Sequence, residues 1–308
     1  MFALIALAAG SAHARWCALA TADTEGHVNP CRSCPAKVGL GGMARRATLV
    51  TAARAREPKL LLIDAGNFLF GPDSFDTRGE VIVAAYGAMK YDAVNLSYRD
   101  FRLGMPRTME LLRGAAFDAV SANLLDERTG KPLARPYVVK RDADGRRIAI
   151  LGLTDPPAGW EQVRELKQQL AGVRIVPSQQ ALAEWLPKAA AESDRIILLY
   201  YGSAAGLARV RADAGNRVSS IAVGGAMDVE DLPGAVPVAA PEKHGKSIAE
   251  LTWPDTGPAL LREISVSPDV PPDPRMQRLL ADYATNAPGR APVATTQSAH
   301  AARAMGPE

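Results

Sequence analysis

The feature that most constrains this chain is a repeated alternation of short apolar runs with longer helical stretches. The apolar runs are nearly continuous, which is typical of strands covered on both faces. They lie at residues 59–64, 92–96, 117–121, 147–151, 195–199 and 219–223. The helical candidates between them are residues 43–56, 80–89, 107–113, 178–192 and 204–212. This alternation predicts a layered α/β fold with functional loops at the carboxyl ends of the strands.

Composition narrows the class of protein further. The 308 residues are 47% hydrophobic and 22% charged, so the chain can bury a sizeable core and is not disordered throughout. The net charge of +3 gives no strong attraction to nucleic acid. One basic stretch, within residues 45–56, is typical of a solvated helix face. We therefore expect no nucleic-acid partner.

The two ends of the chain differ from its middle. Residues 2–10 are apolar and are followed by Ala12-His13-Ala14, the small-residue pattern that a signal peptidase accepts, although a buried N-terminal helix is the alternative. We expect residues 1–14 to be a signal peptide and the protein to be exported, to a periplasmic or extracellular location. No run is long enough to span a membrane. We also expect a C-terminal helix within 267–286 and a disordered tail over 287–308.

Three cysteines lie near the N-terminus. In an oxidising compartment, Cys31 and Cys34 of the Cys31-Arg32-Ser33-Cys34 sequence would form a disulfide and leave Cys17 unpaired. A site for a soft metal ion, built from this pair and His27, is an alternative, as is a pair of redox-active thiols. Covalent haem attachment is excluded because Pro35 stands where the motif needs histidine.

Several motifs at the predicted strand ends occur together in a characteristic order. The motifs lie at residues 23–27, 41–47, 62–68, 91–96, 121–124, 196–202, 221–228 and 243–245. With these motifs in this order, the chain resembles the secreted 5′-nucleotidase branch of the calcineurin-like metallophosphoesterases. The resemblance covers residues 17–266 and implies that family's catalytic domain. The fold it implies is a single-domain sandwich of mixed β-sheets flanked by helices.

The resemblance also implies where a metal centre would stand. Such enzymes bind two divalent metals, bridged by a carboxylate, that activate water for attack on phosphorus. Here Asp23 matches the first motif, but Glu25 occupies the place of its histidine. The bridging aspartate is replaced by Asn67. The ligand asparagine and the catalytic histidine of the third motif are replaced by Tyr98 and Arg99, and an arginine neither binds a metal nor acts as a base.

The later motifs depart from the family in the same way. The resemblance places Tyr200 at one histidine position, and Ala226 and Asp228 at two others. If His13 leaves with the signal peptide and His300 lies in the tail, only His27 and His244 remain for the folded domain. We therefore expect a retained fold without the dinuclear centre.

The first functional hypothesis is a non-catalytic protein whose former metal cleft binds a small anionic ligand or a protein partner. The candidate ligand-binding residues are Asn67, Tyr98, Arg99, Asn123 and Tyr200. Arg99 would supply part of the positive charge that the metals supply in the family. The alternative within this hypothesis is that Arg99 pairs with a nearby carboxylate, such as Asp23, Glu25 or Asp64, and only fills space.

Two further hypotheses keep a metal or redox role. In one, a single divalent metal binds near the N-terminal loop, or the cysteine pair has a redox role. The candidate metal ligands are Asp23, Glu25, His27, Cys31 and Cys34. In the other, the protein is a phosphoesterase with altered ligands. Its candidate oxygen and nitrogen ligands are Asp23, Glu25, Asp64, Asn123, Asp228 and His244. Of these, Asp64 and Asn123 are more typical of residues that brace loops, and His244 of a turn or surface histidine.

Overall fold

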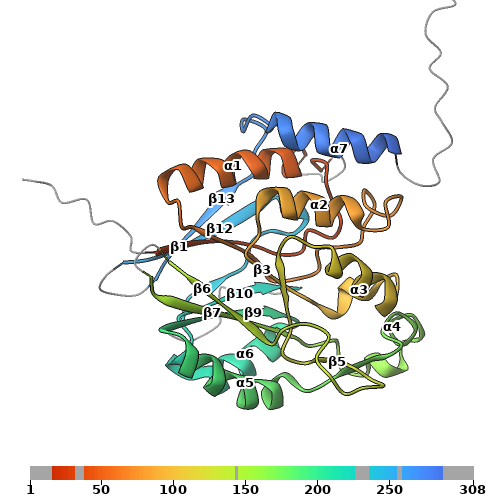
Figure 1. Cartoon of the computed structure of the whole chain (residues 1–308), viewed down its shortest axis with the longest axis vertical. Coiled ribbons are helices and arrows are strands. Elements are labelled where there is room, and N and C mark those ends of the chain that lie inside the picture. The colour runs from red at the N-terminus through yellow and green to blue at the C-terminus, as the bar shows by residue number, and fades with distance from the viewer. Residues whose placement is uncertain (1–15, 32–37, 143–144, 226–235, 255–258, 287–308) are drawn as a thin grey trace, which may run out of the picture.

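A computed structural model describes residues 16–31, 38–142, 145–225, 236–254 and 259–286. Two sheets stack on one another (Figure 1). The first sheet has the strand order β13-β12-β1-β2-β3-β4 and the second the order β11-β10-β9-β7-β6, while β5 and β8 form a separate pair. The strands are β1 (Trp16–Thr21), β2 (Leu61–Asp64), β3 (Ala93–Asn95), β4 (Asp118–Val120), β5 (Leu124–Asp126), β6 (Tyr137–Arg141), β7 (Arg147–Thr154), β8 (Val173–Ile175), β9 (Arg195–Tyr201), β10 (Ser220–Gly224), β11 (Val238–Ala239), β12 (Ser247–Trp253) and β13 (Leu260–Ser265).

Helices cover the outer faces of both sheets. Helices α1, α2 and α7 lie over the first sheet, and α5 and α6 lie over the second (Figure 1). The α-helices are α1 (Met43–Arg56), α2 (Glu80–Met89), α3 (Met105–Arg113), α4 (Arg164–Gln169), α5 (Ser178–Glu192), α6 (Ala204–Ala214) and α7 (Pro274–Asn286). The layered sandwich of mixed sheets predicted from the sequence is therefore confirmed.

The alternation of side chains along β1 shows how one strand serves two cores. Leu19 packs in the cluster formed with α1 and α2, whereas Ala18 and Ala20 pack against the second sheet. All three are fully buried. A strand that is buried on both faces consists of an almost continuous run of apolar residues. The inner strands of this sandwich can therefore be recognised in the sequence.

Parallel pairing brings several strand ends to one edge of the sandwich. β1 pairs in parallel with β2, β2 with β3, and β3 with β4; in the other sheet β9 pairs in parallel with both β7 and β10. The carboxyl ends of β1, β2, β3, β9 and β10 consequently supply neighbouring loops. This arrangement positions the candidate site described below.

Each predicted run or helix corresponds to an observed element, but the sheets also contain strands outside the six predicted runs, among them β1, β5, β6 and β8. The predicted helices 43–56, 80–89 and 178–192 coincide with α1, α2 and α5, and the expected C-terminal helix is α7. β7 and β9 run on to Thr154 and Tyr201, beyond their predicted ends. β6 is an edge strand that buries only Val138 and ends in Lys140 and Arg141, so it lacks the continuous apolar run of the inner strands. Among the described residues no helix is long and apolar enough to cross a membrane. Segments 1–14 and 287–308 lie outside the described residues.

Candidate functional site

Asp23 and Asn67 meet at the ends of neighbouring strands. Both residues have left-handed backbones, with φ angles of 47° and 60°, a conformation that Asp and Asn adopt more readily than most residues. The Asn67 amide donates hydrogen bonds to Asp23 Oδ1, over 2.6 Å, and to the Tyr201 hydroxyl, over 3.0 Å. The backbone N–H of Gly225 donates to Asp23 Oδ2 over 2.6 Å. Neutral donors therefore bind both oxygens of the Asp23 carboxylate.

The Asp23 carboxylate is held in this position by neutral hydrogen-bond donors. Asp23 and Asn67 are only 6% and 7% exposed. Burial raises the pKa of Asp23, and the hydrogen bonds from Gly225 and Asn67 act in the opposite direction. An amide directed at a carboxylate compensates its charge in part, whereas a second carboxylate at this position would require a metal ion or a proton.

The loop after β3 is fixed by Asp100. This buried carboxylate accepts hydrogen bonds from the backbone N–H groups of Asn67, Phe68, Leu69 and Ser97, and from the Ser97 hydroxyl. It ties the loop that contains Tyr98 and Arg99 to the loop that contains Asn67. Asp100 thus holds Tyr98 and Arg99 in a fixed position relative to Asn67.

Arg99 is exposed beside this anchor. Its guanidinium donates a hydrogen bond to the Tyr201 hydroxyl and lies 5.9 Å from the centre of the Tyr98 ring. The two tyrosine rings pack edge to face, with centroids 5.6 Å apart. Arg99 forms no ion pair with any described residue, and Glu25 acts on it only through its longer-range charge. The structure therefore does not show the pairing with a carboxylate that the sequence left open.

The structure brings the two remaining histidines together. The rings of His27 and His244 are stacked with centroids 4.2 Å apart, and His244 Nε2 lies 3.3 Å from Glu25 Oε2. This hydrogen bond lowers the pKa of Glu25, against the effect of its partial burial. The backbone N–H of His244 donates to the carbonyl of Asp23 over 2.6 Å. The cluster of Glu25, His27 and His244 therefore adjoins the Asp23 site.

Sequence reasoning set His244 aside as a turn or surface histidine. The available signal was its motif, Lys243-His244-Gly245, in the position that the resemblance assigns to a strand-end loop. The next residue fixes that loop, because Gly245 has a φ of 66° and a Cβ there would stand 2.0 Å from Arg46 Nη2. The close approach of backbone to the buried Arg46 side chain holds His244 over Glu25.

Two predicted ligand-binding residues lie elsewhere. Tyr200 is fully buried in the cluster that packs against α5 and α6, and its hydroxyl donates to Asp155 Oδ2 over 3.0 Å. Asn123 is also fully buried, and its amide group bonds to the backbone of Thr154 and Val176. The structure does not bring either side chain to the site. Tyr201, the neighbour of Tyr200 on the opposite face of β9, is the tyrosine that reaches it.

Below the site lies a buried network of charged and hydroxyl groups. Asp64, at the end of β2, accepts hydrogen bonds from the hydroxyls of Thr21 and Tyr86, over 2.6 and 2.9 Å. The Arg46 guanidinium donates to Thr24 Oγ1 over 3.0 Å and lies near the same tyrosine. Burial raises the pKa of Asp64 to about 7 despite the hydrogen bonds it accepts. Asp64 therefore braces the loops after β1 and β2 instead of facing a ligand.

The carboxylate and imidazole groups around Asp23 are the candidate metal ligands that the structure describes. In the part of the chain that the structure describes, no group of three His, Cys, Asp or Glu side chains is placed to hold a metal ion. His27 Nδ1 lies 3.0 Å from the backbone carbonyl of Glu25, and the Asp23 oxygens already accept hydrogen bonds. Cys34 and Asp228 lie outside the described residues, so the predicted disulfide of Cys31 with Cys34 stays a prediction.

Comparison with known proteins gives partial sequence matches. No family model matches the chain. A 2′,3′-cyclic-nucleotide 2′-phosphodiesterase/3′-nucleotidase of Yersinia enterocolitica is 29% identical over 166 residues, which are 48% of this chain and 25% of that protein. A 5′-nucleotidase of Vibrio cholerae is 33% identical over 118 residues, covering 37% of this chain and 21% of that protein. The matched part is thus about a quarter of the relatives' length or less.

The structural comparison covers more of the chain. The crystal structure of the calcineurin-like phosphoesterase YfkN from Bacillus subtilis superposes with a TM-score of 0.72, over 88% of this chain and 97% of that one. Sequence identity in this superposition is 19%, so the likeness concerns the fold. The resemblance that the strand-end motifs indicated is confirmed by both comparisons.

Proposed function

Because this chain has the calcineurin-like phosphoesterase fold, we propose that it uses the strand-end site of that fold to bind a small anion without a dinuclear metal centre. The site consists of the strand-end loops that hold Asp23, Asn67, Tyr98, Arg99 and Tyr201. The proposal assigns it a binding role and no catalytic step. The relatives' names describe phosphoesterases that act on nucleotides, so a phosphate group is the anion we favour.

The observation that carries the proposal is the state of Arg99. Its guanidinium is exposed, is oriented by the Tyr201 hydroxyl and has no carboxylate partner among the described residues. A guanidinium presents several N–H donors in a fixed plane, which suits two oxygens of one phosphate group. An arginine held this way is prepared to bind an anion because little side-chain entropy is lost on binding.

The groups around Arg99 favour a ligand that carries one negative charge over a ligand that carries two. The Tyr98 ring stands beside the guanidinium and the Tyr201 hydroxyl lies below it. Glu25, whose pKa is lowered by its hydrogen bond to His244, keeps a negative charge near Arg99. That charge opposes a second negative charge on the ligand. We therefore expect modest affinity for inorganic phosphate that weakens as salt is raised.

Calorimetric titration with inorganic phosphate tests this function. We expect binding in the millimolar range or tighter, and an Arg99→Gln variant weakened by at least about tenfold, or about 1.4 kcal/mol. Arg102→Gln is the matched control, because Arg102 lies on the same loop but its guanidinium packs over Phe75. Absence of binding to the wild-type protein at about 10 mM phosphate, or equal affinity of the Arg99→Gln variant, would contradict the proposal.

An active phosphoesterase with altered ligands is the second candidate function. Its support is the nucleotide phosphoesterase activity named for the relatives together with the Glu25, His27 and His244 cluster beside Asp23. Elemental analysis of protein purified without chelator, and hydrolysis of AMP with added manganese, distinguish it from the binding role. Stoichiometric metal with hydrolysis that Asp23→Ala abolishes would establish this alternative.

We also propose that the protein is exported and that residues 1–14 are its signal peptide. The support is the small-residue cleavage pattern before Arg15. The same oxidising compartment favours a disulfide between Cys31 and Cys34, and the metal or redox alternatives for this pair remain open to the test given in the Discussion.

A further inference from the structure

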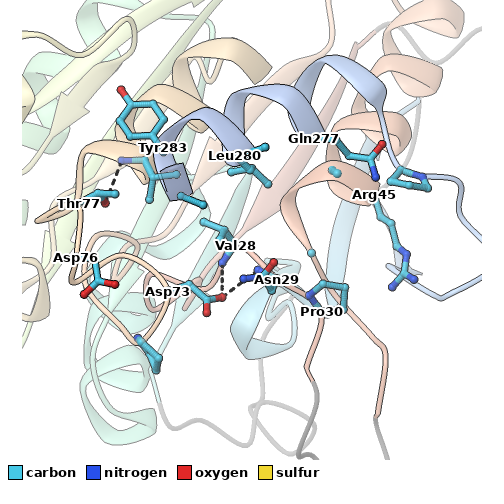
Figure 2. A pocket seen from close by; sticks show the side chains of 17 residues that line it. Val28, Asn29, Pro30, Arg45, Asp73, Asp76, Thr77, Gln277, Leu280 and Tyr283 are labelled. Atoms are coloured by element: carbon cyan, nitrogen blue, oxygen red, sulfur yellow. Dashed lines mark hydrogen bonds between the residues drawn. The ribbon is translucent and has the colours of Figure 1, made fainter. Parts of the chain in front are cut away.

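A cavity of about 790 Å³ lies between α7, the start of α1 and the loop that precedes α2. Figure 2 shows α7 along its upper side, with Leu280 directed toward Val28 and Asn29 on the opposite side, and Tyr283 at the left edge. Val28 and Asn29 follow His27 directly in the sequence, so one loop contributes residues both to the strand-end site and to the cavity. None of the anion-binding residues named above lines the cavity.

The walls of the cavity are apolar on two sides. Val28 and Val81 are buried side chains of the protein body, and Leu280 and the Tyr283 ring belong to α7. A volume of this size is in the range that encloses a small organic molecule. Apolar walls of this kind favour a ligand with a hydrocarbon chain or ring, because its burial removes apolar surface from water.

One end of the cavity is acidic. Asp73 accepts hydrogen bonds from the backbone N–H groups of Val28 and Asn29 through Oδ2, each over 3.0 Å, and its Oδ1 has no described partner. Asp76 forms no hydrogen bond or ion pair with any described residue. Both carboxylates line the cavity (Figure 2). Two carboxylates beside an apolar wall present a negative charge that no described cation neutralises.

The opposite end differs in charge. Arg45 lies there together with Gln277 (Figure 2). Its guanidinium donates to the backbone carbonyls of Gly39 and Gly41. The positive charge of Arg45 repels a cationic group. A ligand with one cationic end would therefore place that end near the two aspartates, away from Arg45.

We propose that this cavity binds a small amphipathic amine, with its ammonium group at Asp73 and Asp76 and its apolar part against Val28, Val81 and Leu280. The ligand is a molecule with one cationic amine and a short hydrocarbon body. The site is separate from the proposed anion site and of opposite charge preference, so either proposal can fail without the other.

Titration with three probes of the same chain length tests the site: hexylamine, hexanol and hexanoate, followed by calorimetry. We expect hexylamine to bind at least tenfold more tightly than hexanol, and hexanoate to bind more weakly than both. Asp76→Asn should reduce hexylamine affinity at least fivefold and leave hexanol affinity unchanged. Asp76 is the position of choice because it makes no described contact that folding needs. Glu165→Gln, an exposed change on α4, is the control and should alter neither affinity.

Three results would overturn the proposal. Absence of hexylamine binding would remove the site itself. Equal affinity for hexylamine and hexanol would show an apolar cavity without preference for a cation. An unchanged hexylamine affinity in the Asp76→Asn protein, with the wild-type melting temperature preserved, would show that the amine binds elsewhere.

Discussion

At the scale of single residues, the hydrogen bond from Asn67 to Asp23 distinguishes this site from one built for metals. Asn67→Asp tests it, because Asp tolerates the same left-handed backbone and the change is therefore electrostatic. Two buried carboxylates in contact cannot both ionise freely. We expect a loss of about 3 kcal/mol in unfolding free energy at pH 7, the equivalent of a two-unit pKa shift, measured by urea denaturation.

The pH dependence of that loss has a defined sign. A carboxyl group whose pKa is higher in the folded than in the unfolded chain destabilises the fold above its unfolded pKa, about 4. The loss in Asn67→Asp should therefore be largest at pH 7 and shrink as the pH falls toward 4. Asn216→Asp, at an exposed position, is the control and should change stability by less than about 0.5 kcal/mol. Full stability of the Asn67→Asp protein at pH 7, with manganese bound, would instead indicate a metal site.

At the scale of elements, β9 directs two adjacent tyrosines to opposite faces of a sheet. Tyr201 faces the site and accepts hydrogen bonds from Asn67 and Arg99, whereas Tyr200 faces α6 and donates to Asp155. Tyr201→Phe should therefore weaken phosphate binding several-fold by releasing Arg99. Tyr200→Phe should lower the unfolding free energy by about 1 to 3 kcal/mol and leave phosphate affinity unchanged. Calorimetry and urea denaturation of both variants measure the two effects.

The two tyrosine variants are controls for each other, since each removes one buried hydroxyl from the same strand. If both changed phosphate affinity equally, the effect would come from disturbance of β9 as a whole. Such a result would contradict the assignment of Tyr201 to the site. This comparison is informative because strand geometry places the two side chains on opposite faces but does not determine which of them faces the site.

At the scale of the whole molecule, the core encloses Cys17, whereas Cys31 is only half-buried. Cys17 is buried on β1, and burial raises its thiol pKa to about 12. We predict that protein secreted by a cell begins at Arg15. In urea it should show one reactive thiol before reduction and three after, if the proposed disulfide joins Cys31 and Cys34. N-terminal sequencing and a thiol titration measure this.

Protein made in a reducing cytoplasm is the control for the thiol titration and should show all three thiols without a reductant. Three reactive thiols in the secreted protein would contradict the disulfide. Bound zinc or copper together with that result would favour the metal alternative for the cysteine pair.

Much of the fold could be predicted from the sequence because its signals are local. Helical patterns over 43–56, 80–89 and 178–192 match α1, α2 and α5, and doubly buried strands leave continuous apolar runs. The same continuity hides the orientation of β9, because both of its faces are apolar. The resemblance aligns Tyr200 with a histidine position of the family, and that alignment assigned Tyr200 to the site, whereas the structure brings Tyr201 there.

The amino-acid sequence by itself determined the order of elements, the resemblance of the strand-end motifs and the departures from them at Glu25, Asn67 and Arg99. Only the tertiary structure decided that His244 stacks on His27, that Arg99 has no described carboxylate partner and that Tyr201 reaches the site. The reason is physical: periodicity and turn chemistry act between near neighbours in the chain, whereas these contacts depend on how two sheets pack and on which loops their strand ends bring together.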